Sequence, residues 1–189
     1  MITESWLSSS VCNEVIAITG YNVYRGDRNS NADMDHGGVA IFVKSICQSK
    51  KLNFADIQLE HVGITFEKNG SRFVCVCVYR PPSSKAAEKA NFCEQLERLI
   101  QMSTIMQNTD AVVFGGDFNE DLLGKCSTPI HDIFIHHGFQ QQVKQSTTDK
   151  GTLIDHIYLR ENTMYQNQSH VIQTLYSYHD ACMLQMHKP

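Results

Sequence analysis

The segment Gly115-Gly116-Asp117-Phe118-Asn119 places a carboxylate and an amide directly after a short apolar run. Asp117 and Asn119 are two residues apart, so in an extended chain both side chains point the same way, while Phe118 points back into the core. Such a carboxylate can accept a proton from water, and the amide can position it. Asp and Asn also bond their own backbone in turns, and the sequence leaves both interpretations open.

A second carboxylate and a histidine follow later in the chain. Asp155 lies within the apolar run from Leu153 to Tyr158. It needs a partner there, because burying an unpaired charge is costly. His179 precedes the last apolar run, and a buried carboxylate can orient an imidazole for proton or phosphate chemistry. We therefore expect Asp155 to pair with His179. The other histidines are interpreted as structural: His36, His61, His131, His136, His137, His156, His170 and His187.

Two more side chains lie at the ends of expected strands. Glu4 could offer a carboxylate oxygen to a hard cation such as Mg²⁺, although a glutamate near an N-terminus is often only a surface charge. Tyr79 precedes Arg80-Pro81-Pro82, where proline ends the strand. We expect its hydroxyl to be solvated and able to bond a phosphate oxygen. An ordinary aromatic residue at a strand edge is the alternative.

Hydrophobic patterning indicates the elements that must position these residues. Strands are expected at Val39–Val43, Val62–Glu67, Phe73–Tyr79, Asp110–Phe114, Leu153–Leu159 and Ala181–Met186. Asn69-Gly70 is a strong hairpin signal. Helical periodicity covers Ser84–Met106, and a second helix starts at Thr128-Pro129 and stops at Gly138. Gly26–His36 is expected to be an exposed polar loop. Strands outnumber helices and several are joined by hairpins, which favours a mixed α/β sandwich.

Composition limits the possible classes of protein. The chain has 189 residues, 42% hydrophobic content and a net charge of −4, which is typical of one globular domain spanning residues 1–189. No apolar run is long enough for a membrane span, and no signal peptide is evident. The seven cysteines have no metal spacing, so Cys75 and Cys77 are interpreted as buried small hydrophobes in a reducing compartment, cytosol or nucleus. The negative net charge does not support a generally basic surface for binding nucleic acid, but local basic residues such as Arg80 could bind substrate.

The order of the motifs carries a resemblance. A Glu motif at Ile2 to Leu7 is followed by segments at Gly37 to Lys44, Val78 to Pro82, Gly115 to Leu122, Gly151 to Leu159 and Ser177 to Asp180. This order resembles the endonuclease/exonuclease/phosphatase superfamily, and specifically the endonucleases of non-LTR retrotransposons. The resemblance implies a four-layer α/β sandwich, with two mixed sheets flanked by helices. It also implies hydrolysis of a phosphodiester with Mg²⁺ (or Mn²⁺) as the cofactor. For a retrotransposon endonuclease, this reaction is the nicking of target DNA, which primes a reverse transcriptase.

The resemblance also assigns roles by position. Glu4 matches the metal-binding glutamate, and Tyr79 matches the tyrosine that contacts the scissile phosphate. Asp117 matches the aspartate that activates water, with Asn119 beside it. Asp155 and His179 match the pair in which the aspartate orients the histidine. Thr147, with Thr148 as the less favoured choice, matches a hydroxyl residue upstream of the fifth motif, and we group it with Arg80 as a candidate for substrate binding.

The chain departs from the family pattern at two places. The family opens with a strand that carries an active-site asparagine, then a helix, and this sequence begins at the Glu motif, so we expect the first strand and helix to be missing. Tyr178 stands where the family has an aspartate. Three functions remain: a DNA-nicking enzyme, a catalytically degenerate or domesticated binding domain, and another phosphoesterase of the superfamily.

Overall fold

The computed structural model of the chain describes residues 1–28, 36–54, 56–83, 85–106, 108–162 and 164–188. Its largest unit is a six-stranded sheet. In spatial order, the strands are β4 (Gln48–Lys51), β5 (Glu60–Lys68), β6 (Ser71–Tyr79), β7 (Ala111–Asp117), β9 (Asp155–Glu161) and β8 (Gln140–Gln141). The sheet is mixed, because β6 and β7 are parallel, whereas the other neighbouring strands are antiparallel.

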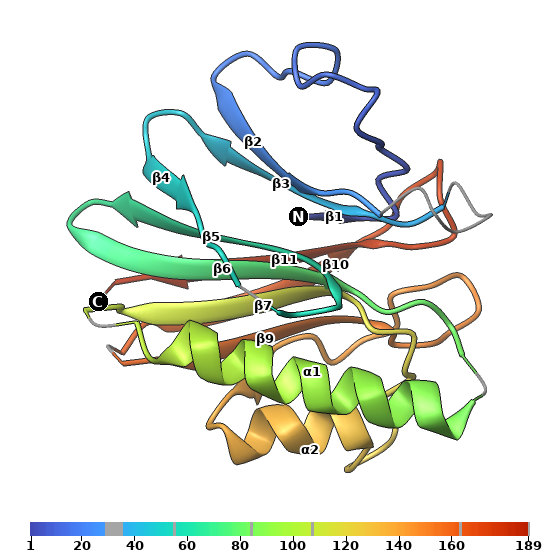
Figure 1. The fold of residues 1–189 in the computed structure, drawn as a ribbon. Helices are drawn as coiled ribbons and strands as arrows, with labels where there is room; N and C mark the ends of the chain where they lie inside the picture. Colours follow the sequence, from blue (N-terminus) through green and yellow to red (C-terminus); the bar gives the residue numbers. More distant parts are fainter. Residues whose placement is uncertain (29–35, 55, 84, 107, 163, 189) are drawn as a thin grey trace.

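A second layer of strands covers one face of this sheet. It contains a three-stranded sheet, β1 (Ile2–Thr3), β3 (Val39–Lys44) and β2 (Tyr21–Gly26), and the hairpin β10 (Gln166–Ile172) and β11 (Ala181–His187). An apolar cluster joins β3 to β5 and β6, and another joins β7 and β9 to β10 and β11. Helices α1 (Ala86–Thr104) and α2 (Pro129–His136) cover the opposite face (Figure 1). The expected α/β sandwich is confirmed, and both helices of the described residues lie on this one face.

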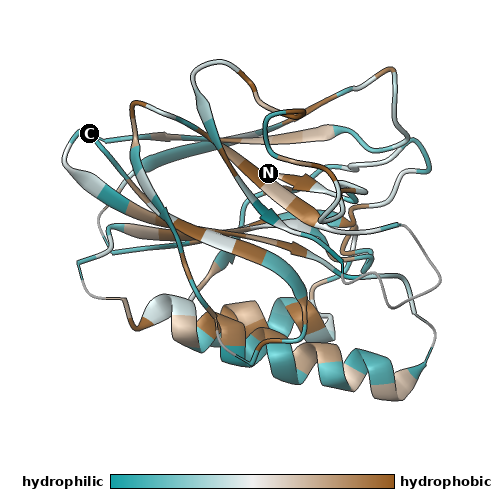
Figure 2. Ribbon diagram, turned by 45° about the horizontal axis from the view of Figure 1, so that its top comes forward, coloured by the Kyte–Doolittle hydropathy of each residue, from teal (hydrophilic) through white to brown (hydrophobic). Residues whose placement is uncertain are grey.

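Local sequence explains why these elements form. The expected stripe of α1, Phe92, Leu96, Leu99 and Ile100, is buried against the sheet, and apolar residues concentrate on the inner strands in Figure 2. Thr128 caps α2, with its side chain accepting a hydrogen bond from His131 N and proline at the first helical position. Neither described helix has the length and apolar composition needed to cross a membrane.

Most expected strands are present, with shifted ends. The strand expected at Leu153–Leu159 begins two residues later, at Asp155. Leu153 and Ile154 instead bond the loop after β7: Leu153 N donates to Asp121 Oδ1 (2.9 Å), and Phe118 N donates to Ile154 O (2.9 Å). These two hydrogen bonds fix the end of β7 and the start of β9 side by side.

The expected hairpin at Asn69-Gly70 joins β5 to β6, with Lys68 paired to Ser71. Helix α1 is shorter than the expected Ser84–Met106 and ends at Thr104. Most of the loop expected at Gly26–His36 lies outside the described residues, but Arg28 is not a free surface charge there, because its guanidinium pairs with Glu60 at 2.5 Å. The described cysteines are all free, and burial raises the pKa of both Cys75 and Cys77 to about 12, as expected for unreactive buried thiols.

Gly116 has a steric role at the end of β7. A Cβ at this position would lie 1.8 Å from the carbonyl oxygen of Val78, whereas a Cβ at Gly115 would meet the flexible tip of Met1 at 2.7 Å. We therefore expect Gly116→Ala to lower the free energy of unfolding by about 3 kcal/mol, because backbone must move, and Gly115→Ala to cost much less. Urea unfolding of both variants checks this, and equal losses would contradict it.

Candidate active site

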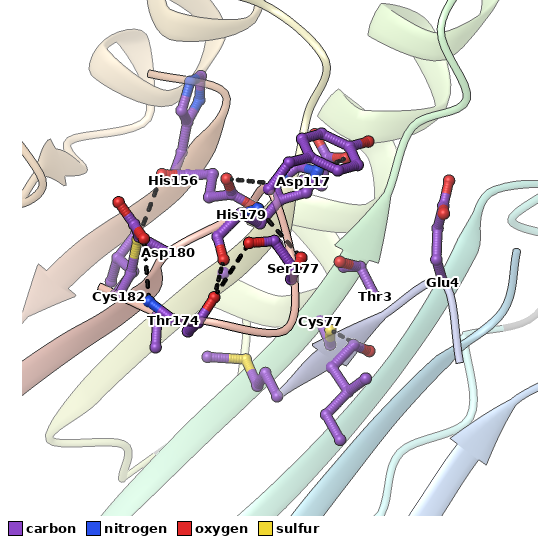
Figure 3. A pocket seen from close by; sticks show the side chains of 18 of the residues that line it. Thr3, Glu4, Cys77, Asp117, His156, Thr174, Ser177, His179, Asp180 and Cys182 are labelled. Carbon is purple, nitrogen blue, oxygen red and sulfur yellow. Dashed lines mark hydrogen bonds and ion pairs between the residues drawn. The ribbon is translucent and has the colours of Figure 1, made fainter. Parts of the chain in front are cut away.

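Four of the eight predicted site residues meet at a pocket of about 470 Å³. It lies between β1, the facing ends of β7 and β9, and the loop that precedes β11 (Figure 3). Among the residues that line it are Glu4, Asp117, Asp155 and His179. These four come from four separate segments, so only the fold brings them together.

Asp117 is the last residue of β7 and is 4% exposed. Its Oδ1 accepts a hydrogen bond from Asn119 N (2.8 Å), and its Oδ2 accepts one from Asn119 Nδ2 (3.2 Å). Asn119 has a left-handed φ of 48°, a conformation that asparagine tolerates better than most residues. Both interpretations of this motif are therefore present: a turn closed by side chains, and a carboxylate held at the mouth of the sheet.

The expected pairing of Asp155 with His179 is present. His179 Nδ1 donates to Asp155 Oδ2 at 2.8 Å, and the other ring nitrogen, Nε2, lies 4.0 Å from Asp117 Oδ2. The backbone fixes the histidine from a second side, because Thr148 bridges to His179 and Asp180 N donates to Thr147 O at 2.8 Å. The imidazole therefore presents Nε2 toward Asp117 in the pocket.

Glu4 and Tyr79 form a separate pair. The Tyr79 hydroxyl donates to Glu4 Oε1. Tyr79 is only 3% exposed, so the expectation of a solvated hydroxyl was wrong: the residue is buried in the apolar cluster that joins β3 to β5 and β6. Burial raises the pKa of Tyr79, with further contributions from its bond to Glu4 and from the nearby carboxylates. The hydroxyl therefore stays protonated, and Glu4 keeps a fixed position in the pocket.

The two residues expected to bind substrate do not line this pocket. Arg80 is 6% exposed, and its Nη1 donates to Phe118 O (2.8 Å) and Asn119 O (3.1 Å). In return, Asn119 Nδ2 donates to Arg80 O (2.8 Å). In this structure the guanidinium of Arg80 holds the loop after β7, and its expected contact with substrate stays a prediction.

Thr147 is also buried, at 0% exposure. Its hydroxyl accepts hydrogen bonds from Ile154 N and Asp155 N, both at 3.2 Å. It does not line the pocket, so in this structure its role is to anchor the start of β9 rather than to contact substrate. The alternative, Thr148, is 5% exposed and bonds Thr152.

The role of Arg80 gives a testable expectation. Arg80→Met removes the donor to two loop carbonyls, and we expect it to lower the free energy of unfolding by about 2 kcal/mol. It should also reduce kcat while leaving KM nearly unchanged, because the side chain holds the loop and does not line the pocket. Steady-state kinetics beside urea unfolding measure both, and a rise in KM at constant kcat would restore the substrate-binding role.

Charges are concentrated in this pocket. Burial first, and then repulsion from Asp155 and Glu4, raise the pKa of Asp117 to about 7. The bond to Asp155, together with attraction to Asp155, Asp117 and Glu4, raises the pKa of His179. Burial lowers the pKa of His156 to about 4, and its Nε2 bonds the carbonyls of Glu120 and Leu153, so this histidine is structural, as expected.

The carboxylates suit a divalent cation. Asp117, Asp155 and His179 each offer a ligand atom, and these atoms all lie within 4.8 Å of one another. Hard cations such as Mg²⁺ prefer oxygen ligands, and a positive ion would offset the repulsion that raises the pKa of Asp117. Glu4 lies on the β1 side of the same pocket (Figure 3), and its carboxylate adds a further oxygen donor.

Sequence reasoning missed two exposed aromatic residues that line the pocket. Trp6 follows Glu4 and has a left-handed φ of 52°, and Tyr176 lies three residues before His179. The available signal was an aromatic residue next to each motif. Single exposed apolar residues are common on protein surfaces, so this signal was weak.

The chain has the α/β-sandwich fold of the endonuclease/exonuclease/phosphatase structures. One example is a family protein of this kind from Leptotrichia buccalis, with a TM-score of 0.62, 17% identity, and 93% of this chain and 75% of that one covered. At the level of sequence, no protein-family model and no curated protein matches the chain.

Two similar structures belong to enzymes that are named for different reactions. The endonuclease domain of TRAS1, a telomere-specific non-LTR retrotransposon, has a TM-score of 0.68 at 15% identity, with 90% of this chain and 80% of that one covered. The 3′ phosphatase NExo from Neisseria, bound to a product DNA hairpin, has a TM-score of 0.70 at 16% identity, with 97% and 86% covered. At these identities the likeness establishes the fold alone.

Proposed function

We propose that this chain is a metal-dependent phosphodiesterase that cleaves DNA and nicks target DNA for retrotransposition. The observation that carries the proposal is the convergence of Asp117 with the Asp155–His179 pair, because His179 Nε2 lies 4.0 Å from Asp117 Oδ2 at the mouth of one pocket. A carboxylate base beside an oriented imidazole, with further carboxylates for a cation, is suited to phosphate chemistry.

In the proposed mechanism, Asp117 accepts a proton from the attacking water, and Asn119 holds the carboxylate in place through its two bonds. His179, protonated on both ring nitrogens, uses Nε2 to donate a hydrogen bond to a phosphate oxygen, while Asp155 accepts from Nδ1 and stabilises the imidazolium. Mg²⁺ or Mn²⁺, held by Glu4 and Asp117, would supply positive charge against the developing charge on the phosphate. Tyr79 positions Glu4.

The proposed partners follow from this reaction. The substrate is a DNA strand, and the likeness to NExo, whose structure holds a product DNA hairpin, supports this choice. The likeness to the TRAS1 endonuclease domain supports a retrotransposon setting, with a reverse transcriptase as the partner activity and an intracellular, nuclear or cytoplasmic, location. Genomic sequence encoding a reverse transcriptase in the same reading frame would support this setting.

The reaction class is tested with two small substrates, a phosphodiester and a phosphomonoester of p-nitrophenol. We expect Mg²⁺-dependent hydrolysis of the diester that EDTA and Asp117→Ala each abolish. Faster hydrolysis of the monoester would replace the nuclease with a phosphatase of the same fold. No hydrolysis of either, by a chain shown to be folded, would reject catalysis.

A second candidate function is nucleic-acid binding without catalysis. Tyr178 favours it, because its ring lies 4.2 Å from the ring of His179, at the position where the family resemblance implies an aspartate. A tyrosine cannot supply that negative charge. The hydrolysis test separates the two functions, since a binding domain remains inactive at every Mg²⁺ concentration.

A further inference from the structure

Three exposed aromatic side chains surround the candidate active site. Trp6 is 59% exposed, Tyr176 is 90% exposed and Tyr178 is 54% exposed. All three line the pocket that also contains Asp117 and His179. Isolated exposed aromatics need no explanation, but these come from two distant segments and meet at one pocket. We call them the aromatic rim.

The backbone under the rim is held firmly, although its rings are exposed. Trp6 N donates to Gly37 O at 2.9 Å, and Asp149 N donates to Tyr178 O at 3.0 Å. Thr174 Oγ1 donates to His179 O at 2.5 Å. Trp6 and Tyr178 therefore project from anchored backbone, which reduces the entropy cost of ordering these segments when a ligand binds.

Charge indicates what these rings are for. The chain has a net charge of −4, and the pocket collects Glu4, Asp117 and Asp155, so a basic surface cannot supply most of the affinity for a polyanion. Stacking of bases on aromatic rings gives affinity that does not depend on net charge. One cation does lie at the rim: Lys150 Nζ is 5.9 Å from the Tyr178 ring centroid, where it can meet a backbone phosphate.

We infer that the aromatic rim stacks unpaired bases, so that the preferred substrate is single-stranded or locally unpaired nucleic acid rather than continuous duplex. This inference rests on the proposed function. In a duplex the faces of the bases are covered by their neighbours, and rings that project around a pocket cannot reach them. Unpaired bases on either side of the scissile phosphate can turn outward and stack on Trp6, Tyr176 or Tyr178.

The experiment uses the single tryptophan of the chain, Trp6, as its probe. The Asp117→Asn chain is titrated in Mg²⁺ with an oligothymidylate of about ten nucleotides, and with a blunt duplex of the same length. We expect the single strand to quench Trp6 fluorescence and to bind at least tenfold more tightly than the duplex. Tyr176→Ser and Tyr178→Ser should each weaken single-strand binding by about tenfold. The matched control, Tyr21→Ser, changes an aromatic that is 40% exposed and does not line the pocket, and should have no effect.

Equal affinity for duplex and single strand would overturn the inference, as would equal effects of Tyr21→Ser and the rim substitutions. Thermal unfolding checks that each variant is folded, which the high exposure of these side chains favours. Because binding is measured without hydrolysis, a failure of this inference can be distinguished from a failure of the proposed function. If the chain hydrolyses the small diester but does not prefer single strands, only the inference about the aromatic rim is rejected. If it binds single strands but hydrolyses nothing, only the proposed catalysis is rejected.

Discussion

Asp117→Asn is expected to lower phosphodiester cleavage by about 10³-fold or more, because it removes both the proposed base and an oxygen donor for the cation. The amide occupies nearly the same volume, so the pocket keeps its shape. The measurement is kcat on the small diester and on DNA, with Asp121→Asn as the matched control. Asp121 bonds the backbone of Leu153 and Leu123 and does not line the pocket. A loss of less than tenfold would remove Asp117 from the mechanism.

The same substitution should change the pH dependence of stability. Because the pKa of Asp117 in the fold, about 7, lies above its ordinary value, the fold binds this proton more tightly than the unfolded chain does. The contribution to stability is therefore full below about pH 4 and is lost as the pH rises through about 7. His179, whose pKa is also raised, acts in the same direction, since its contribution to stability is lost as the pH rises above the ordinary pKa of histidine.

Without metal, the chain should thus be less stable at pH 8 than at pH 5.5. Asp117→Asn should gain on the order of 2 kcal/mol at pH 8 and little at acidic pH, because a neutral amide needs no counter-charge. Urea unfolding in EDTA at the two pH values measures the difference. A variant that is destabilised equally at both pH values would contradict the assignment of this charge to Asp117.

The second large effect is expected at the Asp155–His179 pair. His179→Ala should reduce cleavage by about 10²- to 10⁴-fold, since Nε2 is the proposed donor to the phosphate. Asp155→Asn should reduce it by about 10²-fold or more, because Asp155 acts through His179 by accepting the bond from Nδ1 at 2.8 Å. The double variant should be no worse than His179→Ala alone, since the two side chains form one unit.

The matched control is His136→Ala, which removes an exposed histidine of α2. It should leave cleavage unchanged. In Asp155→Asn, the pH at which His179 loses its proton should fall, because its strongest stabilising contact is lost, and the pH profile of kcat should shift to match. Additive losses in the double variant, or an unshifted profile, would mean that Asp155 and His179 act separately.

Much of the site could be anticipated from the sequence. Asp117 and Asn119 follow an apolar strand and two glycines, which determines the side on which they lie, and an isolated carboxylate such as Asp155 signals a partner. The pairing with His179 was proposed because a buried carboxylate can orient an imidazole, and the family resemblance matched the same two positions. The hairpin at Asn69-Gly70 was predicted, since this dipeptide favours the tight turn that joins two paired strands.

Other parts could not be read from local pattern. Strands β2 and β10 were missed, because Tyr21–Gly26 and Gln166–Ile172 are largely polar and gain their place from pairing with β3 and β11. The burial of Tyr79 depends on an apolar cluster formed with β3 and β5, and the role of Arg80 depends on a loop 38 residues further along the chain. Tertiary contacts of this kind leave no periodic trace in the sequence.

The central claim is that the Asp117, Asp155 and His179 cluster cleaves DNA with a divalent ion. The most direct measurement is the nicking of supercoiled plasmid DNA by the purified chain, in Mg²⁺ and in EDTA, beside Asp117→Ala and His179→Ala. We expect open-circular product that requires Mg²⁺ and that is absent in both variants. Intact plasmid with a demonstrably folded chain, or nicking that persists in both variants, would contradict it.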